Sequence, residues 1–253
     1  MPSPHPLTNG PLVEQAYWDS AYGAIDPCMA ADGDPVRTWL ESELPRAAGD
    51  RHCLELGCYP GRYLAVLGRM GYVVHGMDLT PQVDRMKEVF SSMGIRTGEF
   101  VRADVLDHHP GRTYDVVCSF GLIEHFEHWQ VLIDRHIELL APGGTLVLET
   151  PNFKGWVQWL LHRLFDGVNL RRHHPPAMDP RAWRKYVEQA GLKVSMAGHL
   201  GRFTFWHDTP LTGIHGRSRS LVLRLVNPLL ARLPPGGASY APYAVLIAHR
   251  PPG

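Results

Sequence analysis

An acidic residue and two glycines are spaced as a turn around a cofactor requires. Residues 53–63 read Cys-Leu-Glu-Leu-Gly-Cys-Tyr-Pro-Gly-Arg-Tyr, an apolar run typical of a buried strand, then a turn and the start of a helix. Gly57 permits a sharp turn, and Gly61 would let the helix N-terminus approach a ligand with no Cβ in the way. Because Tyr59 and Pro60 lie between the glycines, the dinucleotide pattern G-x-G-x-x-G is absent. The turn therefore indicates a nucleotide-like ligand of a different kind.

Two further carboxylates follow predicted strands. Asp78 ends the second strand, 23 residues after Glu55, the distance at which an acidic side chain accepts hydrogen bonds from ribose hydroxyls. It could instead cap the helix that begins at Pro81, although Thr80 stands in the better position for that cap. Asp104 follows the third strand, where it could accept from an adenine amino group or form a surface turn.

Alternating strands and helices must position these residues. The strands we expect are 52–56, 72–77, 99–103, 114–119 and 145–149, with helices at 62–70, 81–93 and 128–140. This alternation implies right-handed βαβ crossovers and a Rossmann-like, doubly wound, mainly parallel sheet. Strands at 192–199 and 243–249, joined by a long excursion, predict an antiparallel C-terminal hairpin at the edge of a seven-stranded sheet.

The remaining segments predict helical additions to this sheet. Before it we expect helices at 12–22 and 34–44, the second with Asp34 as N-cap and a proline at its first position. After it we expect helices at 153–165, 180–189 and 218–233, the last interrupted by a proline, with a loop at 166–176 and irregular chain at 201–217. The apolar stripe of Trp156, Trp159 and Leu160 predicts that this face packs on the sheet.

One domain over residues 1–253 is the organisation we expect. A helical cap at 1–50 would precede a cofactor-binding core at 51–152, and insertions at 153–190 and 201–242 would cover the substrate. The length suits one α/β domain with additions better than two independent domains.

Several segments resemble the class I S-adenosylmethionine (SAM)-dependent methyltransferases. The turn at 53–63 is similar to their motif E/D-x-G-x-G-x-G, with Tyr59 replacing the middle glycine. Residues 114–126 are similar to F-D-V-V-x-S-x-x-x-x-E-H, and residues 139–152 to L-L-K-P-G-G-x-L-x-x-x-x-P-N. With the Asp78 strand end, these segments stand in the family's order, and they resemble most the ubiquinone-methyltransferase-like small-molecule branch.

The resemblance implies SAM as cofactor and S-adenosylhomocysteine as its product. Glu55 and the two glycines would bracket the methionyl end, Asp78 would hold the ribose, and Asp104 with Val105 would flank the adenine. The cofactor-binding residues that we expect are Tyr17, Glu55, Gly57, Tyr59, Gly61, Asp78, Leu79, Asp104, Val105 and Phe120. Tyr59 could stack over the ligand or turn away from it.

His125 is the candidate catalytic residue for such a transfer. An amine acceptor only has to arrive neutral, whereas a hydroxyl needs a base. His125 follows the fourth strand, at the carboxyl ends where open α/β sheets bind ligands, although it could equally shape the site. The alternatives are His128, His173, His174, His199 and His207. No metal is predicted, because the sequence has neither a zinc-type His/Cys spacing nor a clear oxygen cage.

Substrate recognition should fall on segments that such enzymes do not all share. Aromatic residues interleaved with Arg and His suit a small acceptor that is flat or anionic. The substrate-binding residues that we expect are Trp18, Tyr22, His128, Asn152, His173, His174 and Phe203.

Composition and charge limit the remaining possibilities. No apolar run is long enough to span a membrane and the N-terminus does not read as a secretory signal, so a cytoplasmic location is expected. The four cysteines form no C-x-x-C and predict reduced core thiols. Acidic residues outnumber basic ones by 21 to 11 in residues 1–150, and basic outnumber acidic by 14 to 4 in residues 151–253. The two halves could pack on each other, or the basic half could meet an anionic partner.

We therefore expect a methyltransferase that acts on oxygen or nitrogen of a small molecule. Its 21 arginines against four lysines, with abundant Ala, Gly and Pro, suggest a bacterial source, and specialised or cell-surface metabolite biosynthesis as the setting. The alternatives are an RNA-modifying methyltransferase, which the basic half would favour, and a SAM-binding protein without transfer, which the altered turn would favour. Nucleic acid is the less expected partner because no Lys/Arg run exceeds two residues, and a homodimer is compatible with the chain.

Overall fold

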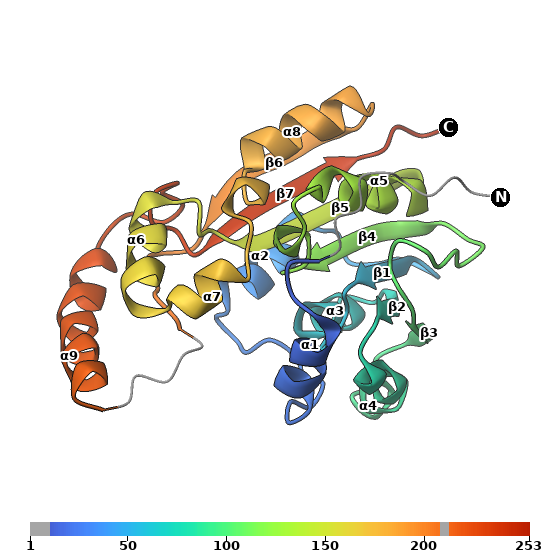
Figure 1. Ribbon diagram of the computed structural model, residues 1–253. Helices are drawn as coiled ribbons and strands as arrows, with labels where there is room; N and C mark the ends of the chain where they lie inside the picture. Colours follow the sequence, from blue (N-terminus) through green and yellow to red (C-terminus); the bar gives the residue numbers. More distant parts are fainter. Residues whose placement is uncertain (1–10, 208–212) are drawn as a thin grey trace.

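A seven-stranded sheet runs through the computed structural model, which describes residues 11–207 and 213–253 (Figure 1). Its strands are β1 His52–Leu56, β2 Val73–Asp78, β3 Thr97–Arg102, β4 Tyr114–Phe120, β5 Leu140–Pro151, β6 Lys193–Leu200 and β7 Tyr243–His249. Their order is β3-β2-β1-β4-β5-β7-β6, and only β7 runs antiparallel to its neighbours β5 and β6. The predicted fold class is confirmed, and the last strand inserts beside β5, so that β6 forms the edge.

Helices cover both faces of the sheet. They are α1 Gln15–Tyr22, α2 Pro35–Glu43, α3 Arg62–Arg69, α4 Met86–Ser92, α5 Trp129–Leu139, α6 Trp156–Phe165, α7 Gly167–Arg171, α8 Pro180–Gln189 and α9 Gly213–Leu230, with short 3-10 turns at Pro81–Arg85, Ile123–His125 and Pro175–Ala177. Alternate strand residues point to opposite faces, so Cys53 packs with α2, α3 and α4 while Leu54 packs with α5 and α8. Two apolar cores therefore hold the sheet between them.

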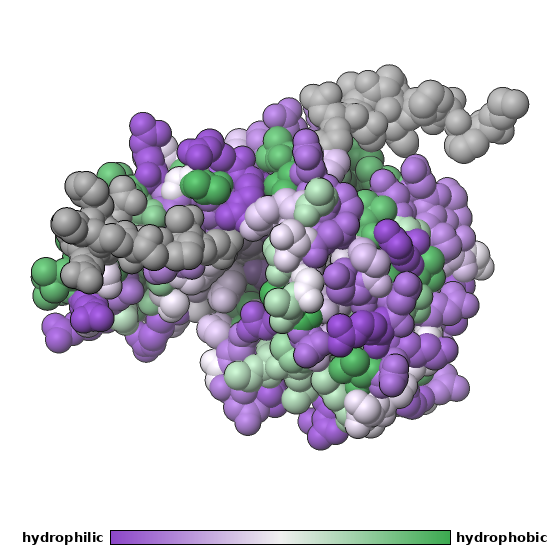
Figure 2. All heavy atoms as spheres, turned by 60° about the horizontal axis from the view of Figure 1, so that its bottom comes forward, coloured by the Kyte–Doolittle hydropathy of each residue, from purple (hydrophilic) through white to green (hydrophobic). Residues whose placement is uncertain are grey.

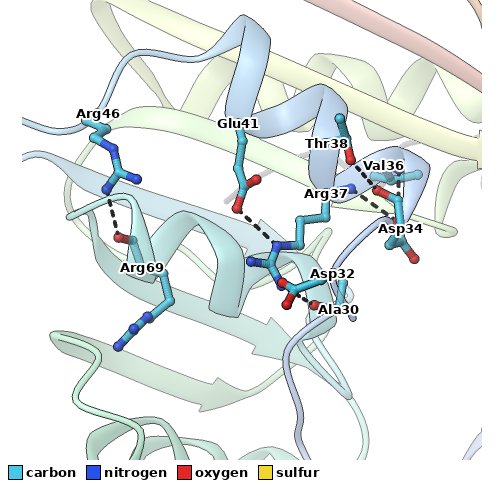
Figure 3. A network of polar contacts seen from close by, with 9 residues as sticks. All are labelled: Ala30, Asp32, Asp34, Val36, Arg37, Thr38, Glu41, Arg46 and Arg69. Atoms are coloured by element: carbon cyan, nitrogen blue, oxygen red, sulfur yellow. Dashed lines mark hydrogen bonds and ion pairs between the residues drawn. The ribbon is translucent and has the colours of Figure 1, made fainter.

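The entry into α2 anchors the chain that precedes the sheet. Asp34 accepts hydrogen bonds from the backbone N–H groups of Val36 and Arg37, at 2.9 and 3.1 Å, which confirms it as the N-cap. The Arg37 guanidinium donates to the Ala30 carbonyl at 2.9 Å and pairs with Asp32 (Figure 3). These bonds hold the segment before α2 in place, and the Ala30 N–H attaches it to the Arg62 carbonyl at the start of α3.

Three local predictions are wrong. The expected loop at 166–176 contains α7 and a 3-10 turn, because backbone hydrogen bonds such as Leu170 N–H to Asp166 continue the helical path. The last helix begins at Gly213 and passes through Pro228 without ending there. The expected helix at 81–93 is divided into a 3-10 turn and α4. Part of the segment expected to be irregular, 208–212, lies outside the described residues.

The outward face of α6 also differs from the prediction. Trp156, Trp159 and Leu160 are 65%, 39% and 40% exposed, so they do not pack on the sheet. Instead Gln158 is buried and donates from Nε2 to the carbonyls of Thr204 and Tyr240, at 3.0 and 2.8 Å. These polar bonds fix the rotation of the helix, and its tryptophans face outward as a result.

Within the described ranges, no helix combines the length and the apolar character that crossing a membrane requires.

Candidate active site

The turn between β1 and α3 has the backbone that its glycines predict. Gly57 and Gly61 have φ angles of 69° and 76°, in the left-handed region that favours glycine, and the Tyr59-Pro60 bond between them is cis. A Cβ at Gly61 would lie 2.5 Å from Met86 and 2.7 Å from Phe90. The absence of a Cβ at Gly61 therefore lets the neighbouring helix α4 pack closely. That it also lets a ligand approach the turn stays a prediction.

Asp78 connects this turn to the end of β2. Its two carboxylate oxygens accept from the backbone N–H groups of Tyr59 and Thr80, both at 2.9 Å. Thr80 occupies the N-cap position, but its side chain makes no capping bond within the described chain. Burial raises the pKa of Asp78, and the backbone donors, that of Thr80 first, oppose the rise. The carboxylate predicted to meet the ribose is thus held in a fixed orientation beside the turn.

Tyr59 turns toward the N-terminal segment. Its side chain is buried, its hydroxyl donates to the Ile25 carbonyl, and its ring lies 5.4 Å from that of Tyr22. The residue that replaces the middle glycine of the motif therefore fastens the chain before α2 onto the turn.

Glu55 is a buried carboxyl with an open acceptor. It is 3% exposed, and its Oε2 has no hydrogen-bond partner among the residues that the structure describes. Burial raises the pKa of Glu55 well above its ordinary value, and the neighbouring Asp78 and Glu149 add to this effect. Such a group can receive a cationic ligand, which would both charge it and satisfy Oε2.

A second buried carboxyl, Glu149, lies near the end of β5. It pairs in register with Phe120 of β4, whose ring is 4.9 Å from that of Tyr63 in α3. Burial raises the pKa of Glu149 well above its usual range, and Glu124 raises it further. Sequence reasoning missed Glu149 as a site residue, although a glutamate inside an apolar strand was a signal that could have found it.

His125 is buried just after the end of β4, and one of its ring nitrogens is hydrogen-bonded to the backbone. Its Nδ1 lies 2.9 Å from the Arg172 carbonyl, which can only accept, so Nδ1 carries the proton and Nε2 carries the lone pair. The Trp18 ring lies 4.8 Å away, so α1 is in contact with His125. Burial lowers the pKa of His125 to about 4, so the imidazole is uncharged near neutral pH.

Glu124 and His173 complete a cluster around His125. Glu124 Oε1 is 3.9 Å from His125 Nε2, and the ring centroids of the two histidines are 4.6 Å apart. His173 Nδ1 lies 2.8 Å from the Asn169 carbonyl and so donates to it, as His125 does to Arg172. Burial raises the pKa of Glu124 to about 8 and lowers that of His173 to about 3. The cluster joins two segments that are about fifty residues apart in the sequence.

Ring contacts extend from this cluster into the cover. The Phe153 ring lies 4.8 Å from His173, 3.9 Å from His162 and 5.6 Å from Trp206. His162, inside α6, was not predicted, because a single histidine in an apolar helix does not stand out in sequence. A continuous row of rings thus leads from α1 to the segment after β6.

Other predicted residues occupy scaffold or peripheral positions. Asn152 is fully buried, and its amide bonds to Ala238, Ala241 and Gly155 are all internal. Asp104 accepts a hydrogen bond from the Leu106 N–H at 2.9 Å, in the turn that was the alternative prediction for this residue. Phe203 lies in a small apolar cluster with α6 and α9. The others are Tyr17, under the Arg172 guanidinium; Leu79, 40% exposed; Val105, in the core; His128, at the start of α5; and His174, whose N–H donates to the Glu124 carbonyl.

The surface is hollowed between the two parts that supply these residues. Figure 2 shows this hollow between the side that carries α6 and α9 and the side that carries α1 and α4. A separate cavity of about 440 Å³, lined by residues such as His109 and Arg135, lies at the amino ends of the strands. Open α/β sheets bind ligands at the carboxyl ends of their strands. The candidate site is therefore the hollow in Figure 2 and not the cavity at the amino ends.

Comparison with known proteins agrees with this geometry. Residues 33–196 match the family model described as a methyltransferase domain. A ubiquinone biosynthesis O-methyltransferase from Xanthomonas euvesicatoria is 31% identical over 139 residues, 54% of this chain and 56% of that protein. A trans-aconitate 2-methyltransferase from Klebsiella pneumoniae is 25% identical over 72% of this chain and 70% of that protein. The chain thus spans little more than half the length of the ubiquinone-related relative.

Solved structures share the fold. A SAM-dependent methyltransferase from Archaeoglobus fulgidus has a TM-score of 0.55 at 19% identity, covering 85% of this chain and 93% of that one. The magnesium protoporphyrin IX methyltransferase from Synechocystis, with S-adenosylhomocysteine bound, has a TM-score of 0.53 at 16% identity, covering 85% and 80%. At these identities the likeness concerns the architecture.

Proposed function

Because the chain belongs to the class I SAM-dependent methyltransferases, we propose that it transfers a methyl group from SAM to an oxygen or nitrogen of a small-molecule acceptor. The observation that carries this proposal is the connection of the β1–α3 turn to Asp78, with the open Oε2 of Glu55 beside it. Of the other residues expected to bind the cofactor, we retain Gly57, Leu79 and Phe120, which stand at the carboxyl ends of β1, β2 and β4.

The residues at the turn fit SAM. The cofactor carries a positive sulfonium and a positive ammonium, and it supplies the methyl group as an electrophilic carbon. Glu55, Asp78 and Glu149 place three carboxyl groups toward the carboxyl ends of β1, β2 and β5, and burial raises the pKa of each. The sulfonium and the ammonium would lower the free energy of the charged forms of these carboxyl groups, since opposite charges in a buried site attract strongly.

The enzyme's main task is to align donor and acceptor. In-line displacement needs the acceptor atom at about 3 Å from the methyl carbon, and positioning alone can remove much of the barrier. Phe120 at the end of β4 and Tyr63 at the start of α3 have their rings in contact. Together they would hold the acceptor against the cofactor. His125 is the proposed catalytic residue, because its Nε2 lone pair is free to receive the proton of an acceptor hydroxyl.

The acceptor fits the row of rings between α1 and the cover. Trp18, Tyr22, His173 and His174 are the substrate-binding residues that we propose, with segments 153–190 and 201–242 as the cover of one domain. A flat, small acceptor would lie edge-on or stacked against such rings. The two relatives compared above are named for small molecules, which supports a small-molecule acceptor. Specialised or cell-surface metabolism is the setting that we propose.

Calorimetric titration with S-adenosylhomocysteine tests the proposal. We expect binding to the wild-type chain, and a loss of at least about 10-fold in affinity in Asp78→Ala, since a hydrogen bond to a charged group contributes about 1.5–3 kcal/mol. Glu55→Gln should reduce affinity while leaving the melting temperature near that of the wild type, because Gln matches the uncharged carboxyl in shape. Asp107→Ala, an exposed carboxylate beyond the third strand, is the matched control.

The outcomes separate the alternatives. Absence of binding to the wild-type chain, or equal affinity in all three variants, would refute the cofactor site. Methylated product from a small-molecule acceptor mixture with the purified chain alone would exclude a SAM-binding protein without transfer. RNA binding with a steep salt dependence would instead favour the nucleic-acid alternative.

A further inference from the structure

Three groups that can bind a metal ion converge at the end of β4. The ligand-capable atoms of Glu124, His125 and His173 all lie within 4.8 Å of one another. Glu124 Oε2 is buried and has no hydrogen-bond partner in the described part of the chain. Because a buried oxygen without a partner is costly, the arrangement favours a ligand that binds it, and a positive ion would also stabilise the charged form of Glu124.

The two histidines are oriented as metal ligands are. Each donates its Nδ1–H to a backbone carbonyl, of Arg172 for His125 and of Asn169 for His173, at 2.9 and 2.8 Å. Metal-binding histidines almost always make such a bond with the nitrogen that does not bind the metal, and it fixes both tautomer and ring direction. Both Nε2 atoms are therefore the ones presented to the cluster.

The distances fit a first-row divalent ion after a small closure. Bonds of about 2.1 Å in a tetrahedron place ligand atoms about 3.4 Å apart. The 3.9 Å between Glu124 Oε1 and His125 Nε2 is close to that value. Small side-chain rotations would bring in His173, whose ring is already in contact with that of His125.

We propose that Glu124, His125 and His173 bind one divalent transition-metal ion of the zinc class. Two imidazoles and one carboxylate supply three ligands, which is the set that leaves a position open in catalytic zinc sites. This inference replaces the sequence prediction that no metal is used, and it would make His125 a ligand rather than the proton acceptor itself.

The ion would activate the acceptor, a role that rests on the proposed function. A hydroxyl oxygen in the open position becomes more acidic, so its O–H bond breaks and the proton leaves to bulk water. The oxygen then forms the new O–CH₃ bond with its own electron pair, while the pair of the broken S–CH₃ bond stays on sulfur as S-adenosylhomocysteine. No oxidant or reductant is required.

Zinc titration of the full chain, purified without a histidine tag and dialysed against a chelator, tests the site. We expect one Zn²⁺ per chain by elemental analysis and a dissociation constant of about 1 µM or tighter by calorimetry. Glu124→Gln and His173→Gln should weaken binding by at least about 10-fold. His173→Cys should retain it, because a thiolate is also a zinc ligand. With Co²⁺ in place of Zn²⁺, the same variants should change the visible absorption spectrum.

His109→Gln is the matched control. His109 also stands beside a carboxylate, with Nδ1 3.8 Å from Glu138 Oε1, but both side chains are exposed at the other end of the sheet. Equal zinc affinity in wild type, Glu124→Gln and His173→Gln, or zinc binding that only His109→Gln removes, would overturn the proposal. Circular dichroism identifies a variant that has not folded, and the cysteine variant then decides the question. S-adenosylhomocysteine binding without zinc binding would refute this site and leave the proposed function standing.

Discussion

The cofactor side and the cover of the site are held together by different kinds of contact. At the β1–α3 turn, Gly57 and Gly61 adopt positive φ, and the Asp78 carboxylate binds two N–H groups of residues no more than 19 positions away. In the cover, formed by α6, α7 and α9, single side chains such as Gln158 make the connections. Structure that depends on residues near one another in the chain can be predicted from the sequence. Structure that depends on the docking of distant side chains cannot.

The two regions also differ in what they expose. The first 150 residues have an acidic excess, and the rest a basic one. Most of the exposed large apolar side chains belong to the cover, namely Trp156, Trp159, Leu160, Leu164, Val168, Leu221, Val222, Leu225 and Leu229. The cover therefore has a small core of its own and an outer face that carries many exposed apolar side chains.

Gly61→Ala should give the largest effect, at the β1–α3 turn. A left-handed alanine costs about 1–2 kcal/mol, and a contact with Met86 at 2.5 Å adds a similar amount, so we expect about 3 kcal/mol less stability in denaturant unfolding. Gly94→Ala is the control: its φ is +73°, and a Cβ there would meet no described atom within 4 Å, so it should cost about 1 kcal/mol. Equal losses would show that α4 tolerates the added methyl group.

Asn152→Ala should loosen the junction between the two regions. Three internal hydrogen bonds join its amide to Gly155, Ala238 and Ala241, and removing them should lower stability by about 2–3 kcal/mol. Gln158→Ala breaks two such bonds and should cost less. If the order of the two losses in thermal unfolding is reversed, the cover is held mainly through α6.

Two neighbouring leucines of α6 test the small core of the cover. Leu161 is 8% exposed and packs in that cluster, so Leu161→Ala should cost about 2 kcal/mol. Leu160 is 40% exposed, so Leu160→Ala should change stability by less than about 0.5 kcal/mol. Equal losses in calorimetric unfolding would mean that the outer face of α6 is covered in solution.

The last prediction concerns pH and belongs to the sheet region. Burial lowers the pKa of His136 in α5 to about 4, below its value in the unfolded chain of about 6.5. The unfolded state therefore binds the proton first, and stability should fall as pH drops from 6.5 toward 4, by at most about 1.4 kcal/mol per pH unit for this group. His136→Gln should flatten the decline measured in denaturant, and the exposed His109→Gln should not; identical slopes would contradict this.

The periodicity and spacing of the sequence were sufficient to predict the order and type of the strands and helices of the sheet. Alternation of strands and helices, Gly57 and Gly61 in the turn, and Asp78 at the end of β2 depend on local preferences, and the structure has each of them. The N-cap at Asp34 also depends only on residues close to it in the sequence. Each of these features depends on a residue and its near neighbours along the chain, so they could be predicted.

Tertiary structure alone decided the rest of the site. Nothing near His125 in sequence indicates that His173 will lie against it, that Tyr59 will fasten the N-terminal segment, or that Leu161 will be buried while Leu160 is not. These outcomes depend on which distant element each helix docks against, and docking is decided by the sum of many side-chain contacts across the fold. The sequence therefore determined the turn at which we propose that the cofactor binds, and the packing of the cover determined which side chains lie around His125.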